Sequence, residues 1–355
     1  RAAIAMENRQ KGGNHAGFVD QVGAEDKIVG LVVGPFEPVG AELGGRGEAV
    51  AVYTGAPIPK GADAVVRVED TRREGDEVLL FAPASPKDIR PKGDDLRRGE
   101  VYLRRGDLLT PGRLGLAAAM GHARLKVFRK PRVGILSTGD EVVEPGEPLP
   151  FGGVYNSNAY SLLGLVLEAG GEPVLLGKVP DQPEAVLERL EGAGPLDLLL
   201  TSGGVSMGEY DVVRKVLERH GEAVFWKVRQ QPGGPLLFAR LGGLPVLGLP
   251  GNPVSSMVTF FLYGRPFLYK LLQRTEPPYG RLEARALTPF EGAKGKKVFR
   301  RGVLSVAEKT VRSTGNQSSG VLRSMAFGNA LVVLPPDRDA REGEEVEVIP
   351  LTFVP

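Results

Sequence analysis

Three apolar segments in the middle of the chain each end abruptly in a glycine-rich loop. They occupy residues 133–141, 198–211 and 246–255. Short apolar runs bounded by Gly, Ser and Asp are typical of buried parallel strands. Since ligands of open α/β sheets bind where the carboxyl ends of strands converge, the three loops predict one shared site. Their backbone N–H groups, hydroxyls and carboxylates suit phosphate and magnesium, so the sequence predicts an anionic ligand.

Composition narrows the class of protein. A chain of 355 residues exceeds one ordinary core, so two or three domains are expected. Its apolar content of 42% and charged content of 25% are typical of a soluble globular protein. No apolar run approaches the roughly 20 residues of a membrane span, and no secretory signal precedes the first domain, which predicts a cytoplasmic location. The net charge of +2, with both signs interleaved, argues against nucleic-acid binding.

The residues that could hold a metal are restricted. The chain has no cysteine, which excludes disulfides and thiolate sites, and its three histidines, His15, His122 and His220, are far apart in sequence. A histidine cluster or catalytic triad is therefore not expected. Any metal should be hard and bound by oxygen, which favours Mg²⁺.

The pattern along the chain predicts four segments. Residues 1–26 form an N-terminal remnant or linker, and 27–128 form a β-rich domain of short strand-like runs. Residues 129–274 alternate strands and helices, as in a doubly wound parallel α/β domain, and 275–355 form a small β domain. Within the α/β domain we expect strands at 132–137, 173–179, 196–201 and 223–228, a hairpin at 236–246, and helices at 159–169 and 253–272.

The loop after residue 246 contains the sharpest local signal. Asn252 is a good N-cap and Pro253 suits the first helical position. The free N–H groups of this helical turn, with Ser255 and Ser256, could hold a phosphate. The alternative is that Asn-Pro only begins a core helix. For the helix at 159–169, Ser157 or Asn158 is the expected cap.

The other two loops each offer ligand groups and a structural alternative. Gly203, Gly204 and Gly208 allow close backbone approach, whereas the same glycines could serve only a tight turn. Asp211 could cap the next helix or coordinate a cation, and the carboxylates of Asp140 and Glu141 could be ligands or ordinary exposed turn residues. Asp181 fits an N-cap better than a ligand contact.

Six stretches, taken in order, carry a resemblance to a known family. They lie at residues 54–66, 137–141, 179–181, 203–211, 250–255 and 314–320. Together they resemble the molybdopterin molybdenumtransferase family, from about residue 28 to the C-terminus. The resemblance implies a molybdopterin-binding α/β domain flanked by a β-rich domain and a C-terminal β-barrel, in a homodimer. It also implies Mg²⁺-dependent insertion of molybdate into adenylylated molybdopterin with release of AMP, and a molybdopterin adenylyltransferase as a candidate partner.

The resemblance also implies roles for particular residues. The expected catalytic residues are Thr54, Glu141, Asp181 and Asp211, of which Glu141 and Asp211 would lie near Mg²⁺ and the pyrophosphate. Thr54 and Ser318 would contribute from neighbouring domains. The expected cofactor-binding residues are Ser137, Thr138, Gly139, Gly203, Gly204, Ser206, Pro250, Gly251, Asn252, Pro253, Ser255 and Ser318.

Two departures from the family pattern leave other functions open. Residues 230–235 stand where the family usually reads Lys-Pro-Gly-Lys-Pro, so Gln231 and Gly234 replace cations that would help to hold molybdate. Near the N-terminus, residues 3–8 offer no secure counterpart of a functional aspartate. The alternatives are a non-catalytic molybdopterin-binding paralogue or scaffold, and a nucleotide pyrophosphatase on a related domain.

Overall fold

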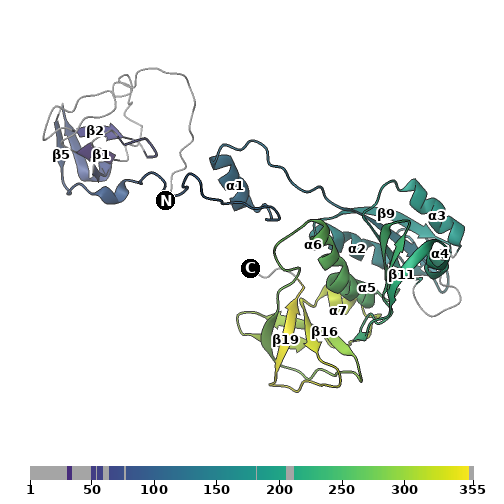
Figure 1. Cartoon of the computed structure of the whole chain (residues 1–355). Helices are drawn as coiled ribbons and strands as arrows, with labels where there is room; N and C mark the ends of the chain where they lie inside the picture. Colours follow the sequence, from purple (N-terminus) through teal and green to yellow (C-terminus); the bar gives the residue numbers. More distant parts are fainter. Residues whose placement is uncertain are drawn as a thin grey trace. The chain divides into compact units, whose positions relative to one another are not determined.

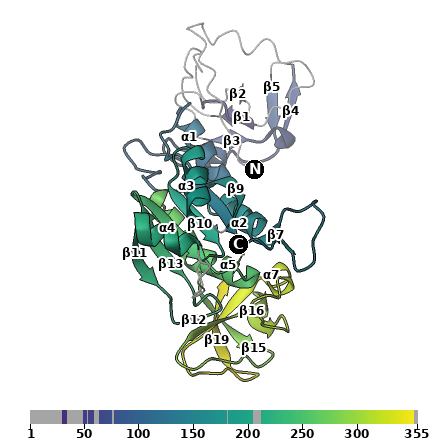
Figure 2. The same cartoon turned by 90° about the vertical axis from the view of Figure 1, so that its right-hand side faces the viewer.

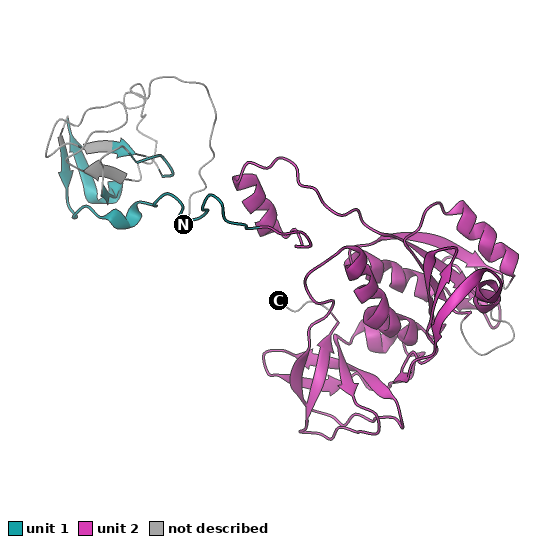
Figure 3. Cartoon of the chain, in the orientation of Figure 1, with its two compact units in different colours: residues 1–102 teal, residues 103–355 magenta. Residues whose placement is uncertain are grey.

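The computed structural model describes residues 30–33, 49–52, 54–58, 64–75, 77–180, 182–204 and 212–351. The chain divides into two compact units, residues 1–102 and residues 103–355 (Figure 3). No helix among the described residues is both long enough and apolar enough to cross a membrane.

The first unit is built from short antiparallel strands. A three-stranded sheet has the order β2-β1-β3, and a hairpin joins β4 to β5. The strands are β1 (Gly30–Val33), β2 (Ala49–Val52), β3 (Val65–Val66), β4 (Thr71–Glu74) and β5 (Glu77–Leu80), with 3₁₀ turns η2 (Val68–Asp70) and η3 (Pro86–Asp88). The β-rich character predicted here is confirmed. Strand β4 has the sequence Thr-Arg-Arg-Glu, which lacks an apolar face, so it pairs with β5 without a local hydrophobic signal.

A six-stranded sheet forms the middle of the second unit. Its strands are β6 (Arg132–Thr138), β9 (Glu172–Val179), β10 (Leu198–Ser202), β11 (Gly221–Trp226), β13 (Leu237–Leu241) and β14 (Leu244–Leu249). The order is β11-β13-β14-β10-β6-β9, and only β13 runs against the other five strands. The predicted hairpin at 236–246 is the β13–β14 pair, whose turn uses Gly242 and Gly243 at φ 52° and 88°.

Helices cover both faces of this sheet, as Figures 1 and 2 show. The helical segments are α2 (Ser157–Glu168), α3 (Pro183–Gly192), α4 (Val212–His220), α5 (Pro253–Thr259), η4 (Phe260–Gly264) and α6 (Arg265–Leu271). Strand alternation sends Ile135 and Leu200 to the core under α2 and α6, and Leu136 and Leu199 to the core under α3 and α4. The predicted doubly wound α/β domain is therefore confirmed.

Two details of the helices differ from expectation. The Asn156 side chain, rather than Ser157 or Asn158, caps α2 by accepting a hydrogen bond from the Ala159 N–H. The helix begins two residues earlier than predicted, so the cap lies earlier too. The long apolar helix predicted at 253–272 is continuous through α5, η4 and α6, but its middle turn is a π-helix.

A closed five-stranded barrel ends the chain. Its strands are β15 (Leu282–Ala286), β16 (Lys297–Ser305), β17 (Thr310–Ser313), β18 (Ala330–Leu334) and β19 (Glu345–Pro350), and β16 pairs with both β17 and β18. The barrel implied by the resemblance is confirmed. The short strand β12 (Gln230–Gln231) leaves the α/β domain and pairs with the start of β16. The unit also holds α1 (Pro111–Ala119), α7 (Arg323–Ala326) and the strand pair β7 (Val142–Val143) and β8 (Val154–Tyr155).

Candidate functional site

The sheet order places a topological switch point at the carboxyl ends of β6 and β10. The chain leaves β6 toward β9 through α2, and then returns to the opposite side of β6 to form β10. The direction of winding therefore reverses between β6 and β10, which is the position where open α/β sheets bind ligands. The register places Ser202 opposite both Ser137 and Leu249, so the ends of β6, β10 and β14 are level.

The loops that follow these three strands approach one another through glycine. At Gly203, with φ at 89°, a Cβ would lie 3.1 Å from the Thr138 carbonyl oxygen and 3.2 Å from its Oγ1. A Cβ at Gly251 would lie 3.7 Å from the Gly203 Cα, and the Gly203 N–H donates to the Leu249 carbonyl at 3.1 Å. The structure therefore brings three of the predicted loops into one surface.

A side chain from α2 ties two of the loops together. The Asn158 amide donates from Nδ2 to Ser202 Oγ and to the Gly251 carbonyl, both at 2.7 Å. The Oδ1 atom of Asn158 and the Oγ1 atom of the neighbouring Thr201 are buried with no hydrogen-bond partner among the described residues. Buried polar atoms without a partner are energetically costly, so these two atoms favour polar contacts with a ligand at the ends of β6, β10 and β14.

Ser137, by contrast, has a structural partner. Its side chain is only 2% exposed and donates from Oγ to Asn156 Oδ1 at 3.0 Å. Asn156 in turn donates from Nδ2 to Glu144 Oε1 at 2.7 Å while its Oδ1 caps α2. The Ser137 hydroxyl therefore orients the cap of α2.

The β6 loop also carries an exposed carboxylate above a glycine. The Glu141 carboxylate oxygens would lie 2.7 and 2.8 Å from a Cβ at Gly139, which has φ at 124°. Lys178, on the neighbouring strand, donates from Nζ to the Asp140 carbonyl at 3.0 Å. The oxygen donors around Glu141 and Thr138 suit Mg²⁺ chemically. Within the described ranges, however, no group of three or more His, Asp or Glu side chains is arranged to hold a metal.

The start of α5 has fewer free donors than its sequence predicts. Asn252 lies at the N-cap position and Pro253 at the first helical position, but the Asn252 side chain makes no capping hydrogen bond. The Val254 N–H donates to the Ser319 carbonyl at 3.1 Å, so the barrel already uses one donor of this turn. Ser255 and Ser256 are buried, and Ser256 Oγ has no partner among the described residues.

The barrel contributes the segment at 314–320 through a buried arginine. The Arg301 side chain is fully buried and donates from Nε to Ser324 Oγ at 3.1 Å and from Nη2 to the Ser318 carbonyl at 3.2 Å. Its Nη1 has no partner in the described part of the chain. Burial, and then the charge of neighbouring Arg300, lowers the pKa of Arg301 to about 10. Arg301 therefore positions the loop that contains Ser318.

The loop that contains Gln231 and Gly234, the two departures from the family pattern, packs against α5. A Cβ at Gly233 would lie 2.2 Å from Thr259 Cγ2 and 3.5 Å from the Ser255 carbonyl. Gln231 is exposed, while the neighbouring Gln230 is buried. Gly234 does not have a positive φ, and a Cβ there would lie 3.2 Å from the Gln230 carbonyl. The exposed Gln231 position can hold another long side chain, whereas a Cβ at Gly234 would require the Gln230 carbonyl to shift by a few tenths of an ångström.

Three of the predicted residues, Asp181, Ser206 and Asp211, lie outside the described residues. Thr54 is exposed and belongs to the first compact unit.

Asn158 and Arg301 were missed as site residues. A sequence signal existed for each. Asn158 follows Asn156 in a polar run before an apolar helix, and Arg301 follows Arg300 inside a strand whose alternation must turn one of them inward.

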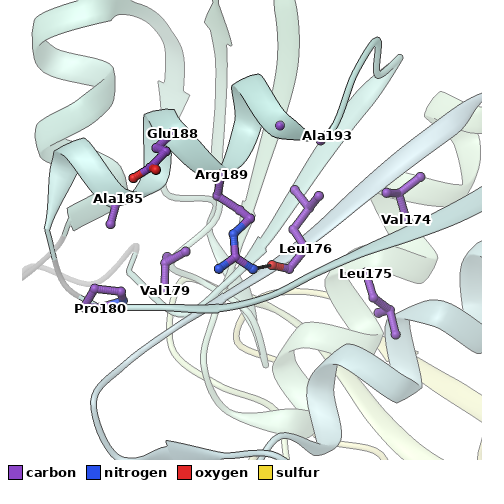
Figure 4. A pocket seen from close by; sticks show the side chains of 10 residues that line it. Val174, Leu175, Leu176, Val179, Pro180, Ala185, Glu188, Arg189 and Ala193 are labelled. Atoms are coloured by element: carbon purple, nitrogen blue, oxygen red, sulfur yellow. Dashed lines mark hydrogen bonds between the residues drawn. The ribbon is translucent and has the colours of Figure 1, made fainter.

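A cavity lies away from these loops. It has a volume of about 560 Å³ and is formed between the edge strand β9 and α3 (Figure 4). Val174, Leu176 and Val179 supply an apolar wall, and the Arg189 guanidinium donates to the Leu176 carbonyl. None of the three loops lines it, so its position does not support the predicted site.

Three protein-family models match successive parts of the chain. Residues 20–121 match a model described as the MoeA N-terminal region (domain I and II), 134–270 a probable molybdopterin binding domain, and 283–351 the MoeA C-terminal region (domain IV).

Similar proteins span most of the chain. A molybdopterin molybdenumtransferase of Haemophilus influenzae is 38% identical over 86% of this chain and 78% of its own length. Another, from Bacillus subtilis, is 32% identical over 93% of this chain and 76% of its own. The crystal structure of a molybdopterin biosynthesis protein from Pyrococcus horikoshii superimposes with a TM-score of 0.74 at 30% identity, covering 92% of this chain and 87% of that one.

Proposed function

The chain belongs to the molybdopterin molybdenumtransferase family, and on that premise we propose that it inserts molybdate into adenylylated molybdopterin and releases AMP. The observation that carries the proposal is the meeting of Thr138, Gly203 and Gly251 at the switch point of the sheet. Such a surface of backbone groups and hydroxyls suits a phosphorylated ligand. The family relationship supports the pterin as its chemical class.

We assign the residues as follows. Gly139, Gly203, Gly204, Pro250 and Gly251 bring backbone groups close to the pterin phosphate. Further polar contacts come from Thr138, Ser206, Asn252, Ser255 and Ser318, while Ser137 and Pro253 shape the loops. Breaking a phosphoanhydride depends more on charge neutralisation and positioning than on a strong nucleophile.

Four carboxylate or hydroxyl residues have proposed catalytic roles. Glu141 and Asp211 hold Mg²⁺, which when bound neutralises charge on the phosphates. The exposed carboxylate of Glu141 beside Gly139 supports this assignment. Asp181 and Thr54 act on the substrate from neighbouring segments.

The direct test mixes the purified protein with adenylylated molybdopterin, Mg²⁺ and molybdate and measures AMP. Release of AMP should require molybdate and should stop when Mg²⁺ is removed with a chelator. Glu141→Gln should lower the rate about 100-fold if its carboxylate holds the Mg²⁺ that neutralises the leaving phosphate. If AMP is never released under any oxyanion, the transferase proposal is wrong.

A second candidate, a pterin-binding protein without turnover, is favoured by Gln231 and Gly234. The exposed Gln231 position admits lysine, and the backbone conformation of Gly234 admits it with a small shift of the Gln230 carbonyl. If the wild type binds molybdopterin without turnover, the double variant Gln231→Lys/Gly234→Lys should gain molybdate-dependent AMP release. A double variant that binds and still does not turn over would reject this explanation.

We also propose the wider setting of the activity. The proposed domain boundaries divide the chain into residues 1–26, 27–128, 129–274 and 275–355. The protein acts in the cytoplasm as a homodimer. It receives its substrate from a molybdopterin adenylyltransferase. Sedimentation of the purified chain tests the dimer. A monomer at micromolar concentration would contradict it.

A further inference from the structure

A separate cavity of about 270 Å³ lies between the α/β domain and the barrel. It is lined by Gln230 of β12, Tyr263 of η4 and Lys297 of β16, among others. Tyr263 follows Ser255 by eight positions, which corresponds to about 12 Å along a helix. The cavity is therefore distinct from the loops that meet at the start of α5.

The strand β12 separates this cavity from the departure position Gln231. The Tyr263 hydroxyl donates to Gln230 Oε1 at 2.6 Å, so Gln230 points into the cavity wall. Since successive side chains of a strand alternate, the exposed Gln231 lies on the other face. The cavity therefore does not use the residues expected to hold molybdate.

The floor and walls of the cavity are apolar and aromatic. Leu262, Phe299 and Ile349 are 9%, 6% and 1% exposed and form the floor. The Tyr279 ring stacks on Phe261 with centroids 5.7 Å apart and planes 25° apart, which fixes its orientation. A flat apolar group would find both contact area and a fixed aromatic partner there.

The rim carries three cations and no carboxylate. Arg229, Arg281 and Lys297 line the cavity, and none of its described lining residues is Asp or Glu. Arg281 pairs with Glu347 outside the lining. Within the described residues no carboxylate lies within 4 Å of the charged groups of Arg229 or Lys297. This excess of positive charge around an apolar floor favours the binding of an anion.

We propose that this cavity binds a compact aromatic phosphate. The ring would lie between the tyrosines and the apolar floor, and the phosphate would lie between Arg229 and Lys297. The volume is slightly below the roughly 300 Å³ at which small-molecule pockets begin, so the ligand is a small ring system. This proposal is independent of the proposed transferase activity.

The test is calorimetric titration of the full chain with phenyl phosphate, inorganic phosphate and phenol. Phenyl phosphate should bind at least tenfold more tightly than either fragment, because only it uses both floor and rim. The variant Arg229→Gln/Lys297→Gln should bind it about tenfold more weakly, the loss expected for charge-assisted contacts at a partly exposed site. The matched control Arg285→Gln/Arg312→Gln, which removes two exposed barrel charges, should leave the affinity unchanged.

Two outcomes would overturn the proposal. One is binding of inorganic phosphate as tight as that of phenyl phosphate, and the other is unchanged binding in the Arg229→Gln/Lys297→Gln variant. If the double variant does not fold, Arg229→Gln alone gives the same test, because Arg229 is exposed.

Discussion

The close approach of Gly203 to Thr138 can be tested with a single methyl group. Gly203→Ala places a Cβ at φ 89°, which costs about 1–2 kcal/mol in the left-handed region. The same Cβ would lie 3.1 and 3.2 Å from two oxygens of Thr138, at the end of a buried strand that cannot move freely. Crowding of this kind costs about 1–3 kcal/mol more. We expect Gly203→Ala to lower the free energy of unfolding by about 2–5 kcal/mol in total.

Gly243 provides a matched control. It has φ at 88° in the β13–β14 turn, and a Cβ there would meet nothing within 4 Å. Gly243→Ala should therefore cost only the backbone part, about 1–2 kcal/mol. Urea unfolding measures both variants, and pterin binding should weaken at least tenfold only in Gly203→Ala. Equal losses of stability with unchanged ligand affinity in both would refute the argument that the loops meet through glycine.

Three further substitutions test other contacts. Asn158→Ala leaves the acceptors on Ser202 and Gly251 without their donor and should cost about 1–3 kcal/mol in urea unfolding; a change under about 0.5 kcal/mol would count against the bridge. Hydrogen bonds from Arg129 hold the pKa of Asp197 below its ordinary value of 3.8, so this stabilisation is present above pH 3.8 and is lost as pH falls through the lowered pKa. Asp197→Asn should therefore cost about 1 kcal/mol at pH 7, and melting curves of the two proteins should converge at acid pH. Arg301→Met removes a buried charge, and the lowered pKa of Arg301 corresponds to a burial cost of about 3 kcal/mol. The same substitution removes two hydrogen bonds of about 1.5–3 kcal/mol each, so the free energy of unfolding should change by at most about 3 kcal/mol. Hydrogen exchange in 314–320 should accelerate, and unchanged exchange would contradict the positioning role of Arg301.

The elements of the α/β domain were predictable because their signals are local. The runs around Ile135, Leu199 and Leu247 are continuous and apolar, as strands buried on both faces require. The Asn252-Pro253 pair marked the helix start, and the hairpin predicted at 236–246 turns at the paired glycines 242–243. The cap of α2 was misplaced by one or two residues, because Asn156, Ser157 and Asn158 all have capping side chains and only packing selects among them.

The sequence by itself determined which segments become buried strands, that their loops carry groups for an anionic ligand, and that no thiolate chemistry is possible. Only the tertiary structure decided that β6 and β10 lie at the switch point, that Asn158 joins the loops after β10 and β14, and that the barrel already occupies a donor at the start of α5. The physical reason is the distance along the sequence over which each interaction acts. Apolar periodicity and capping act between near neighbours, whereas the partner of a donor is set by which distant segment packs against it.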